Sequence, residues 1–303
     1  MPPKVSVCCI TYNHERFLRQ AIDSALMQEA NFDVEIVIGE DCSTDSTRAI
    51  VQEYQRLYPE RVKALLPAAN LGIMPNLMAT LAACTGEYIA LLEGDDFWTD
   101  KHKLALQVEI LDSRPDCVLC IHDAETFADD GSIQTTLFST TFPDMLSPER
   151  PIISQKDIIV QGWGIPTASM LFRRSALQLP DWYVKVYSGD YTLQLLLTQH
   201  GNIYYLPRVM SKYRHHQDSV SRVSNRTKSL SVINKRIFEL KQYQELFPAF
   251  AERYDSILQY WYFERSLLMR QNKKGINGWL DYFRAITLSP KLFNAWLFRS
   301  AAK

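Results

Sequence analysis

Three carboxylates follow one apolar run of the sequence in close succession. Glu93, Asp95 and Asp96 end the segment "YIALLEGDD". Like charges this close repel one another and disturb one another's pKa values, so a protein that keeps them together usually supplies a cation. A divalent cation among them would reverse the local charge and let the site hold a phosphate group. Oxygen ligands favour Mg²⁺ or Mn²⁺, and we expect one of these ions as cofactor.

The elements before this cluster alternate in the way that is typical of parallel βαβ units. Short apolar runs predict strands, and apolar residues at helical spacing predict the helices between them. The strands are expected at residues 5–11, 33–40, 62–66, 87–93 and 117–122, and the helices at 15–28, 43–57, 74–84 and 103–113. Ligands of parallel sheets bind beyond the carboxyl ends of the strands. We therefore expect Thr11, Asp41 and the pair Asp95–Asp96 to meet in one crevice.

The rest of the chain is less regular. Residues 123–155 predict a long, partly ordered connection, followed by a strand at 167–174 and a helix that begins near Asp190. The pattern is helical from about residue 225 onward. We expect two parts, a catalytic domain of residues 1–222 and a helical extension of residues 223–303.

Composition excludes several classes of protein. The 33 Lys and Arg residues nearly cancel the 34 Asp and Glu residues, which gives no case for nucleic acid as a partner. The six cysteines lie mostly in apolar, strand-like runs, which favours reduced thiols over a metal or redox site. Neither a GxGxxG turn nor a GxxxxGK[ST] loop occurs, so the common dinucleotide and P-loop sites are not expected.

Four segments, in this order and spacing, carry a family resemblance. They are "VSVCCITYNHERFLRQAIDSALMQ", "VIGEDCSTDSTRAIV", "NLGIMPNLMATLAACTGEYIALLEGDDFW" and "SGDYTLQLLLTQHG". Over residues 5–221 the chain resembles the inverting nucleotide-sugar glycosyltransferases of the GT-A fold, of the family 2 type found among bacterial polysaccharide enzymes. The resemblance implies an α/β fold with a mostly parallel sheet flanked by helices, followed by a helical C-terminal extension.

The resemblance also implies a nucleotide site. The Asp41 carboxylate would accept a hydrogen bond from the uracil ring nitrogen, which makes UDP the expected nucleotide. Glu93 stands where many relatives have Asp, and it could touch the metal, a ribose hydroxyl or neither. Turn formation and helix capping are the alternatives for several of these residues, and capping is the first interpretation for Asp45. The expected nucleotide-binding residues are Thr11, Tyr12, Asn13, Asp41, Asn70, Gly72, Glu93 and Asp95.

The remaining implied roles concern the metal, the diphosphate and the acceptor. Asp96 and His216 would bind the metal, and Arg214 would neutralise a phosphate. Asp190 would be the catalytic base that takes the proton of the acceptor hydroxyl, although it could also only cap its helix. Trp163 and Thr167 would line the acceptor side, with burial in the core as the alternative for the tryptophan.

The extension has a pattern of its own. Between residues 270 and 303, seven basic residues and several aromatic residues accompany the single acid Asp281. Such helices could lie on an anionic membrane surface, or they could pack on the catalytic domain or on a second subunit, which would make the protein a homodimer. No apolar run is long enough to span a membrane. We expect a cytoplasmic protein that could bind the inner face of the cell membrane peripherally.

Together these features predict a metal-dependent, inverting glycosyltransferase. It would transfer a sugar from a nucleotide diphosphate donor, with UDP preferred, to a hydroxyl of a glycan or lipid-linked acceptor in surface polysaccharide synthesis. One alternative is a catalytically inactive nucleotide-binding scaffold of a polysaccharide assembly complex. Another is a nucleotidyltransferase, but "TYNHERF" lacks the glycines of the basic loop that this class generally carries.

Overall fold

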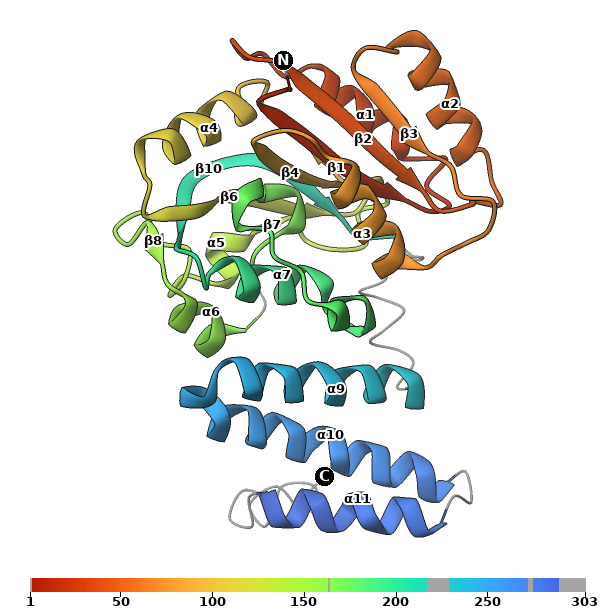
Figure 1. Cartoon of the computed structure of the whole chain (residues 1–303), viewed down its shortest axis with the longest axis vertical. Coiled ribbons are helices and arrows are strands. Elements are labelled where there is room, and N and C mark those ends of the chain that lie inside the picture. Colours follow the sequence, from red (N-terminus) through yellow and green to blue (C-terminus); the bar gives the residue numbers. More distant parts are fainter. Residues whose placement is uncertain (1, 163, 217–228, 272–274, 289–303) are drawn as a thin grey trace. The chain divides into compact units, whose positions relative to one another are not determined.

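The computed structural model describes residues 2–162, 164–216, 229–271 and 275–288 of the 303-residue chain (Figure 1). Residue contacts divide the chain into two units. The first comprises Met1–Val184 and Gly189–His216, and the second comprises Lys185–Ser188 and Gln217–Lys303. The assignment of Lys185–Ser188 to the second unit was not predicted from the sequence.

The first unit is built on one mixed sheet with the strand order β3-β2-β1-β4-β9-β6-β10-β5. Its N-terminal strands are β1 (Val5–Thr11), β2 (Val34–Glu40), β3 (Val62–Leu65) and β4 (Tyr88–Glu93). The pairs β1–β2, β1–β4 and β2–β3 are all parallel. This confirms the predicted strands, and it brings the carboxyl ends of β1, β2 and β4 to one edge of the sheet.

The other half of the sheet is more irregular. It contains β5 (Phe97–Trp98), β6 (Cys117–Phe127), β9 (Leu171–Arg173) and β10 (Asn202–Arg214). Strand β9 is antiparallel to β4 and β6, whereas β10 is parallel to β6. The sequence did not predict β10, because its register shifts between Leu206 and Val209, around Pro207, and this shift interrupts the alternation of its side chains.

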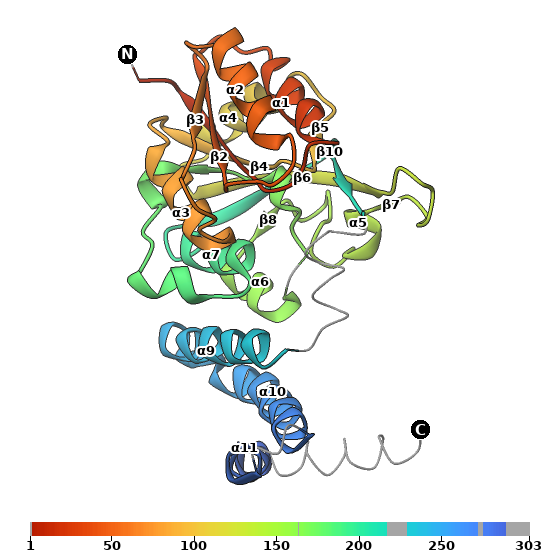
Figure 2. The same cartoon turned by 90° about the vertical axis from the view of Figure 1, so that its right-hand side faces the viewer.

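Helices cover both faces of the sheet (Figures 1 and 2). Helices α1 (Leu18–Leu26), α2 (Thr47–Leu57) and α4 (Lys103–Ser113) lie on one face, and α3 (Ile73–Ala83) and α7 (Gly189–Leu197) lie on the other. Helix α1 shows why they pack there: it buries Leu18, Ala21, Ile22 and Ala25, which share one helical face, in the main hydrophobic core.

The predicted connection of residues 123–155 contains short elements. Strand β6 continues to Phe127, and β7 (Thr136–Leu137), α5 (Phe138–Thr141) and β8 (Ile152–Ile153) follow. Helix α6 (Gln155–Gln161) begins with a capping box between Ser154 and Asp157. The 3₁₀ turns η1 (Thr167–Ser169), η2 (Arg174–Ala176) and η3 (Asp181–Lys185) complete the path to α7.

The second unit is helical, as predicted. It contains α9 (Leu230–Leu246), η4 (Pro248–Phe250), α10 (Ala251–Gln271) and α11 (Gly275–Leu288). Helices α10 and α11 are joined by an ion pair in which the buried Asp281 accepts from Arg265 at 2.7 and 2.8 Å. Among the described residues, no helix has both the length and the apolar composition that crossing a bilayer requires.

Candidate active site at the carboxyl edge of the sheet

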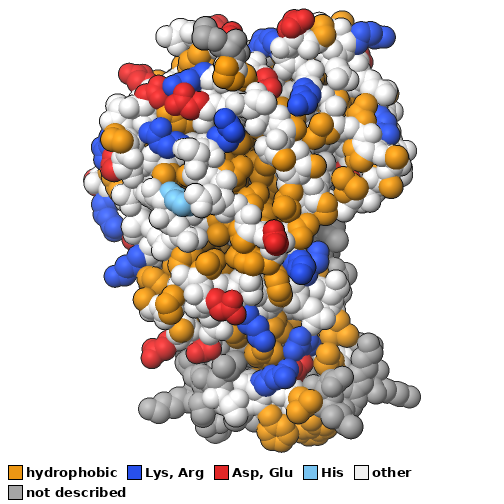
Figure 3. Space-filling view, in the orientation of Figure 1, with side chains coloured by type: hydrophobic (Ala, Val, Ile, Leu, Met, Phe, Trp, Pro, Cys, Tyr) orange, Lys and Arg blue, Asp and Glu red, His pale blue; other side chains and the backbone are white. Residues whose placement is uncertain are grey.

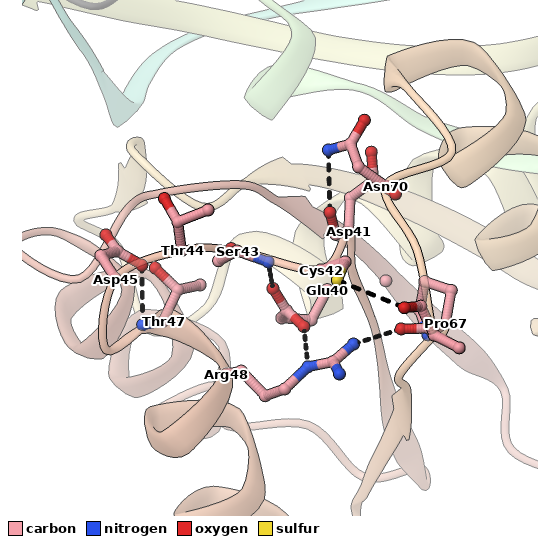
Figure 4. Close-up of polar contacts among 12 residues, drawn as sticks. Glu40, Asp41, Cys42, Ser43, Thr44, Asp45, Thr47, Arg48, Pro67 and Asn70 are labelled. Carbon is pink, nitrogen blue, oxygen red and sulfur yellow. Dashed lines mark hydrogen bonds and ion pairs between the residues drawn. The ribbon is translucent and has the colours of Figure 1, made fainter.

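The end of β2 is fixed by the carboxylate of Asp41 (Figure 4). One oxygen accepts from the Leu71 amide at 2.7 Å, and the other accepts from the Gly72 amide at 2.9 Å. The Asn70 side chain donates to the Asp41 carbonyl at 2.9 Å. Gly72 has a φ of 88°, a conformation that favours glycine. Three predicted nucleotide residues, Asp41, Asn70 and Gly72, thus form one connected loop, and a base would use the remaining lone pairs of Asp41.

A second carboxylate, which the sequence analysis did not single out, supports this loop. Glu40 is fully buried and accepts from the Ser43 amide and from Arg48 Nε, both at 2.6 Å (Figure 4). Arg48 also donates to the Pro67 carbonyl at 2.5 Å. A buried carboxylate needs such partners to offset its desolvation. The available signal was the pair of acidic residues, Glu40 and Asp41, at the end of the predicted strand.

The turn after β1 is tied to the turn after β2. The Thr11 carbonyl accepts from the Asp41 amide at 3.1 Å, and the Asn13 side-chain oxygen accepts from the Thr44 amide at 2.8 Å. Asn13 therefore holds the two turns together. Asp45 accepts from the Thr47 and Glu15 amides at 2.9 and 3.1 Å. The N-cap of α2 is the next residue, Ser46, so Asp45 stabilises the turn before the helix. Tyr12 is 42% exposed and offers a ring face for stacking.

Gly94 allows the acidic turn after β4 to approach β1 closely. A Cβ atom at Gly94 would lie 2.5 Å from Thr11 Oγ1 and 2.9 Å from His14 Nδ1. Both of these atoms are buried and lack a hydrogen-bond partner among the described residues, and so does Asp96 Oδ2. The other oxygen of Asp96 accepts from the Arg214 amide at 2.8 Å. Unmatched buried polar atoms carry a free-energy cost, and here they gather at the predicted ligand site.

The carboxylates of this turn influence one another. Burial, together with the charges of Asp95 and Asp190, raises the pKa of Glu93 to about 8, although a hydrogen bond with Thr167 opposes this shift. Burial and the charges of Asp95 and Glu93 also raise the pKa of Asp96. Burial alone would raise the pKa of Asp95, but the hydrogen bond with His216 and the nearby His14 hold it below its usual value. Asp95 is therefore the carboxylate best suited to remain ionised.

Three side chains from separate segments could hold a metal ion here. His14 follows β1, Asp95 follows β4 and His216 follows β10, and their ligand atoms all lie within 4.8 Å of one another. Asp95 Oδ2 is 3.0 Å from His216 Nε2 and 3.9 Å from His14 Nε2. Ligands about 2.1 Å from one ion would be separated by about 3 to 4 Å, so these residues fit a cation.

This ligand set differs from the predicted pair of Asp96 and His216. The group contains His216, as predicted, together with Asp95, and it does not include Asp96. The Asp96 carboxylate is buried, and one of its oxygens accepts from the Arg214 amide. The sequence analysis also missed His14, although it follows the predicted nucleotide-binding residues directly. Burial lowers the pKa of His14, which keeps the imidazole in the neutral form that binds metals.

Arg214, predicted to neutralise a phosphate, is bonded to groups of the protein itself. Its guanidinium is buried, donates to the Asp95 carbonyl at 2.9 Å and to Gln20 at 2.6 Å, and is paired with Asp129. It also lies over the ring of Phe17, 4.7 Å from its centroid. A phosphate contact would require these bonds to be exchanged, so in this arrangement Arg214 supports the acidic turn.

The predicted base lies near the acidic cluster. Asp190 is in the first turn of α7, and its charge contributes to the raised pKa of Glu93. Thr167, predicted for the acceptor side, begins η1 and interacts with the same Glu93. Trp163 lies outside the described residues. Segments that are far apart in the sequence therefore surround Glu93.

Comparison with known proteins identifies the family. The family model described as "Glycosyl transferase family 2" matches residues 6–179. The chain belongs to glycosyl transferase family 2. An uncharacterised Mycobacterium tuberculosis protein is 35% identical over 216 residues, which are 71% of this chain and 60% of that protein. The Bacillus subtilis glycosyltransferase TuaG, assigned to teichuronic acid biosynthesis, is 33% identical over 43% of this chain and 50% of its own length. This family 2 chain thus spans only part of these curated relatives.

Solved structures agree on the fold. Staphylococcus aureus TarS 1-349 in complex with UDP-GlcNAc superposes with a TM-score of 0.62 at 18% identity, covering 93% of this chain and 79% of that one. The mannosyltransferase PcManGT of Pyrobaculum calidifontis, in complex with GDP-Man and Mn²⁺, gives a TM-score of 0.59 at 15% identity, covering 100% and 80%. This family 2 chain therefore has the GT-A fold with C-terminal helices, which confirms the predicted fold class.

Proposed function

We propose that this family 2 protein is a metal-dependent, inverting glycosyltransferase whose catalytic base is Asp190. The observation that carries the proposal is that His14, Asp95 and His216 place their ligand atoms within 4.8 Å of one another at the carboxyl edge of the sheet, where a cation could hold a diphosphate. Asp190, in the first turn of α7, is assigned as the base from the family resemblance. A base on one side and a diphosphate site on the other are what an in-line displacement at a sugar carbon requires. Family membership supports the reaction class.

The nucleotide would bind where the ends of β1 and β2 meet. The loop of Asp41, Asn70 and Gly72 is already ordered by its own hydrogen bonds, so it would lose little conformational freedom on binding. The exposed Tyr12 ring would stack on the base. UDP is the preferred nucleotide, which the complex of TarS with UDP-GlcNAc supports by analogy.

The cation would be held by His14, Asp95 and His216. Asp96, the next residue along the chain from Asp95, has one buried oxygen without a partner among the described residues. When bound, it would neutralise the diphosphate and stabilise the departing charge. Two imidazoles and one carboxylate favour Mn²⁺ over Mg²⁺, because magnesium prefers oxygen ligands. The Mn²⁺ in the PcManGT complex is consistent with this preference.

Asp190 would take the proton from the acceptor hydroxyl as that oxygen attacks the sugar. A positioned general base contributes about 100- to 10,000-fold to the rate of such a step. The attack comes from the face opposite the leaving nucleotide, so the configuration of the sugar carbon inverts. The acceptor would be a glycan or lipid-linked hydroxyl of a surface polysaccharide, which the assignment of TuaG to teichuronic acid biosynthesis supports.

Calorimetric titration tests the nucleotide and metal parts of this proposal. UDP, GDP and dTDP are titrated with Mn²⁺, with Mg²⁺ and without metal, into the wild type and the Asp95→Asn variant. We expect UDP to bind more tightly with Mn²⁺ and the variant to lose most of this metal dependence. Nucleotide binding that ignores the metal would contradict the metal site.

Turnover separates an enzyme from an inactive scaffold. We expect Asp190→Asn to bind UDP and Mn²⁺ like the wild type but to release UDP from its sugar donor about 100-fold more slowly or worse. The Asp181→Asn variant, which changes an aspartate outside the site on η3, is the matched control. Equal turnover by Asp190→Asn and the wild type would contradict the assignment of the base.

We further propose that α11 binds the inner, anionic face of the cell membrane. Trp279, Leu280 and Phe283 are 51%, 49% and 58% exposed, and hydrophobic side chains lie beside Lys and Arg over these helices (Figure 3). The sequence of residues 270–303 contains seven basic residues and a single acid, Asp281. Asp281 is buried and paired with Arg265 and Arg284, so the described side chains of α11 include no exposed acid. Apolar and basic residues together favour anionic lipid.

Vesicle flotation tests this surface. Vesicles of phosphatidylcholine with and without phosphatidylglycerol are mixed with the wild type and with the Trp279→Ser/Phe283→Ser variant. We expect binding only to the anionic vesicles, and a loss of at least about 10-fold in the double variant. Leu267→Ser on α10, 38% exposed in the wild type, is the control that keeps binding. A double variant that floats like the wild type, or that instead dissociates a dimer, would contradict the proposal.

A further inference from the structure

A buried carboxylate of the helical unit is bound to the segment that leads into α7. Glu239 lies on α9 and is 4% exposed. One of its oxygens accepts from the backbone amides of both Tyr187 and Ser188, each at 2.9 Å. The other accepts from the Ser188 hydroxyl at 3.3 Å. These three hydrogen bonds offset the desolvation of the carboxylate, and they fix two consecutive peptide groups.

A second side chain of α9 holds the same segment. The guanidinium of Arg236, one turn before Glu239, lies 4.3 Å from the centroid of the Tyr187 ring and 4.9 Å from that of Trp261. Stacking of this kind is strongest where water is excluded. Arg236 fixes the side chain of Tyr187 and Glu239 fixes its backbone, so α9 restrains the segment twice.

The restrained segment ends directly before the proposed base. Ser188 is followed by Gly189, the first residue of α7, and then by Asp190. Gly189 is itself fixed within the first unit, because its carbonyl accepts from the Tyr183 hydroxyl at 2.9 Å. The backbone before Asp190 is therefore held on both sides of the peptide bond between Ser188 and Gly189.

We propose that Glu239 is a positioning residue that fixes the chain leading into Asp190, so that the C-terminal helices take part in catalysis through one hydrogen-bonded carboxylate. The proposal rests on the proposed function, in which Asp190 is the base. A general base must lie within hydrogen-bonding reach of the proton it takes, and small displacements cost large factors in rate. Loss of the Glu239 hydrogen bonds would weaken the restraint on the backbone amides of Tyr187 and Ser188.

Three variants separate positioning from mere stability of the helical unit. Glu239→Ala removes all three hydrogen bonds. Glu239→Gln keeps an oxygen that can accept from both backbone amides, so it serves as the conservative rescue. Asp281→Asn is the matched control, because it weakens a buried ion pair with Arg265 in the same unit and has no bond to residues 185–188 among the described contacts.

Two readouts are measured on the full chain. Hydrogen exchange with mass spectrometry follows the amides of residues 187–190, and UDP release from a nucleotide-sugar donor gives kcat and KM. We expect Glu239→Ala to exchange these amides at least about 10-fold faster and to lower kcat about 10-fold with little change in KM for the donor. Glu239→Gln should restore most of both, and Asp281→Asn should change neither.

The outcomes that overturn the proposal are distinct from those that overturn the function. If Glu239→Ala leaves exchange and kcat unchanged, or if Asp281→Asn lowers both as much, Glu239 has no positioning role. If Asp190→Asn turns over donor like the wild type, the base assignment fails, and the proposal for Glu239 fails with it. If Asp190→Asn loses turnover as expected while Glu239→Ala leaves amide exchange and kcat unchanged, the positioning role of Glu239 is rejected and the proposed function stands.

Discussion

Around Asp41 and Glu40 each carboxylate oxygen meets a donor from the chain itself, whereas around Asp96 buried polar atoms lack a partner among the described residues. Asp41 binds the Leu71 and Gly72 amides. In the acidic turn, by contrast, Thr11 Oγ1 and Asp96 Oδ2 are unmatched. The two halves of the site follow β2 and β4, which lie on either side of β1 in the same sheet.

This difference in hydrogen bonding indicates which half of the site would be stabilised by a ligand. The Asp41 half is satisfied by the protein and is rigid before a nucleotide arrives, which reduces the entropy that binding would cost. The acidic half retains repulsion and unmatched atoms, which the proposed cation and its bound diphosphate would relieve. We therefore expect changes to the two halves to have opposite effects on stability, and very different effects on metal binding.

The largest expected effect is on the metal. We expect His14→Ala, His216→Ala and Asp95→Asn each to weaken Mn²⁺ binding by about 10- to 100-fold or more, since each removes a ligand. The paramagnetic signal of free Mn²⁺, titrated with protein, measures this affinity without any turnover. His200→Ala, which changes an exposed histidine, is the control. If His14→Ala binds Mn²⁺ as tightly as this control does, the third ligand is wrong.

The next largest effect is on stability, where substitutions in the two halves should change the free energy of unfolding in opposite directions. In the metal-free protein we expect Asp96→Asn to raise the free energy of unfolding by about 1 kcal/mol, because it removes a charge from a repelling cluster. Asp41→Asn should lower it by about 2 kcal/mol, because one backbone amide of the loop loses its acceptor. Urea unfolding followed by circular dichroism measures both. Loss of stability in both variants would contradict this, because it would show that the Asp96 carboxylate stabilises the folded protein as the Asp41 carboxylate does.

Local sequence patterns carry more information about the half of the site around Asp41 than about the half around Asp95 and Asp96. The β-strand pattern and the "EDCSTD" turn are local signals, and they led to Asp41 and Asp45. The loop that Asp41 binds was expected only from the family resemblance. The partners of Asp95 come from the ends of β1 and β10, and the register shift in β10 concealed that strand. His14 and the burial of Arg214 depend on this long-range pairing, which local patterns do not encode. The proposed role of Glu239 could not be predicted either, because its partners Tyr187 and Ser188 are about 50 residues away in the sequence.

The smallest expected effect is a pH dependence centred on Glu93. Its pKa is about 8 in the folded protein, against 4.5 for an ordinary glutamate, mainly because of burial. Between these values the folded state binds a proton that the unfolded state has released, so the free energy of unfolding falls as the pH rises from about 4.5 and levels off above about 8. Glu93→Gln removes this dependence. The difference in the free energy of unfolding between Glu93→Gln and the wild type should be about 1 to 2 kcal/mol more favourable to the variant at pH 9 than at pH 5, after allowance for solvent screening.

Adding Mn²⁺ tests whether the cation binds beside Glu93 in the acidic half. A bound cation favours the ionised form of Glu93, so in its presence the difference between Glu93→Gln and the wild type should shrink at pH 9. Urea unfolding at pH 5, 7 and 9, with and without Mn²⁺, measures it. Glu35→Gln is the control, because the hydrogen bonds from Ser6 and Thr85 offset burial and lower the pKa of Glu35. That variant should lose stability above pH 5 and ignore the metal. A Glu93 effect that is equal with and without Mn²⁺ would mean that the cation does not bind beside the acidic turn.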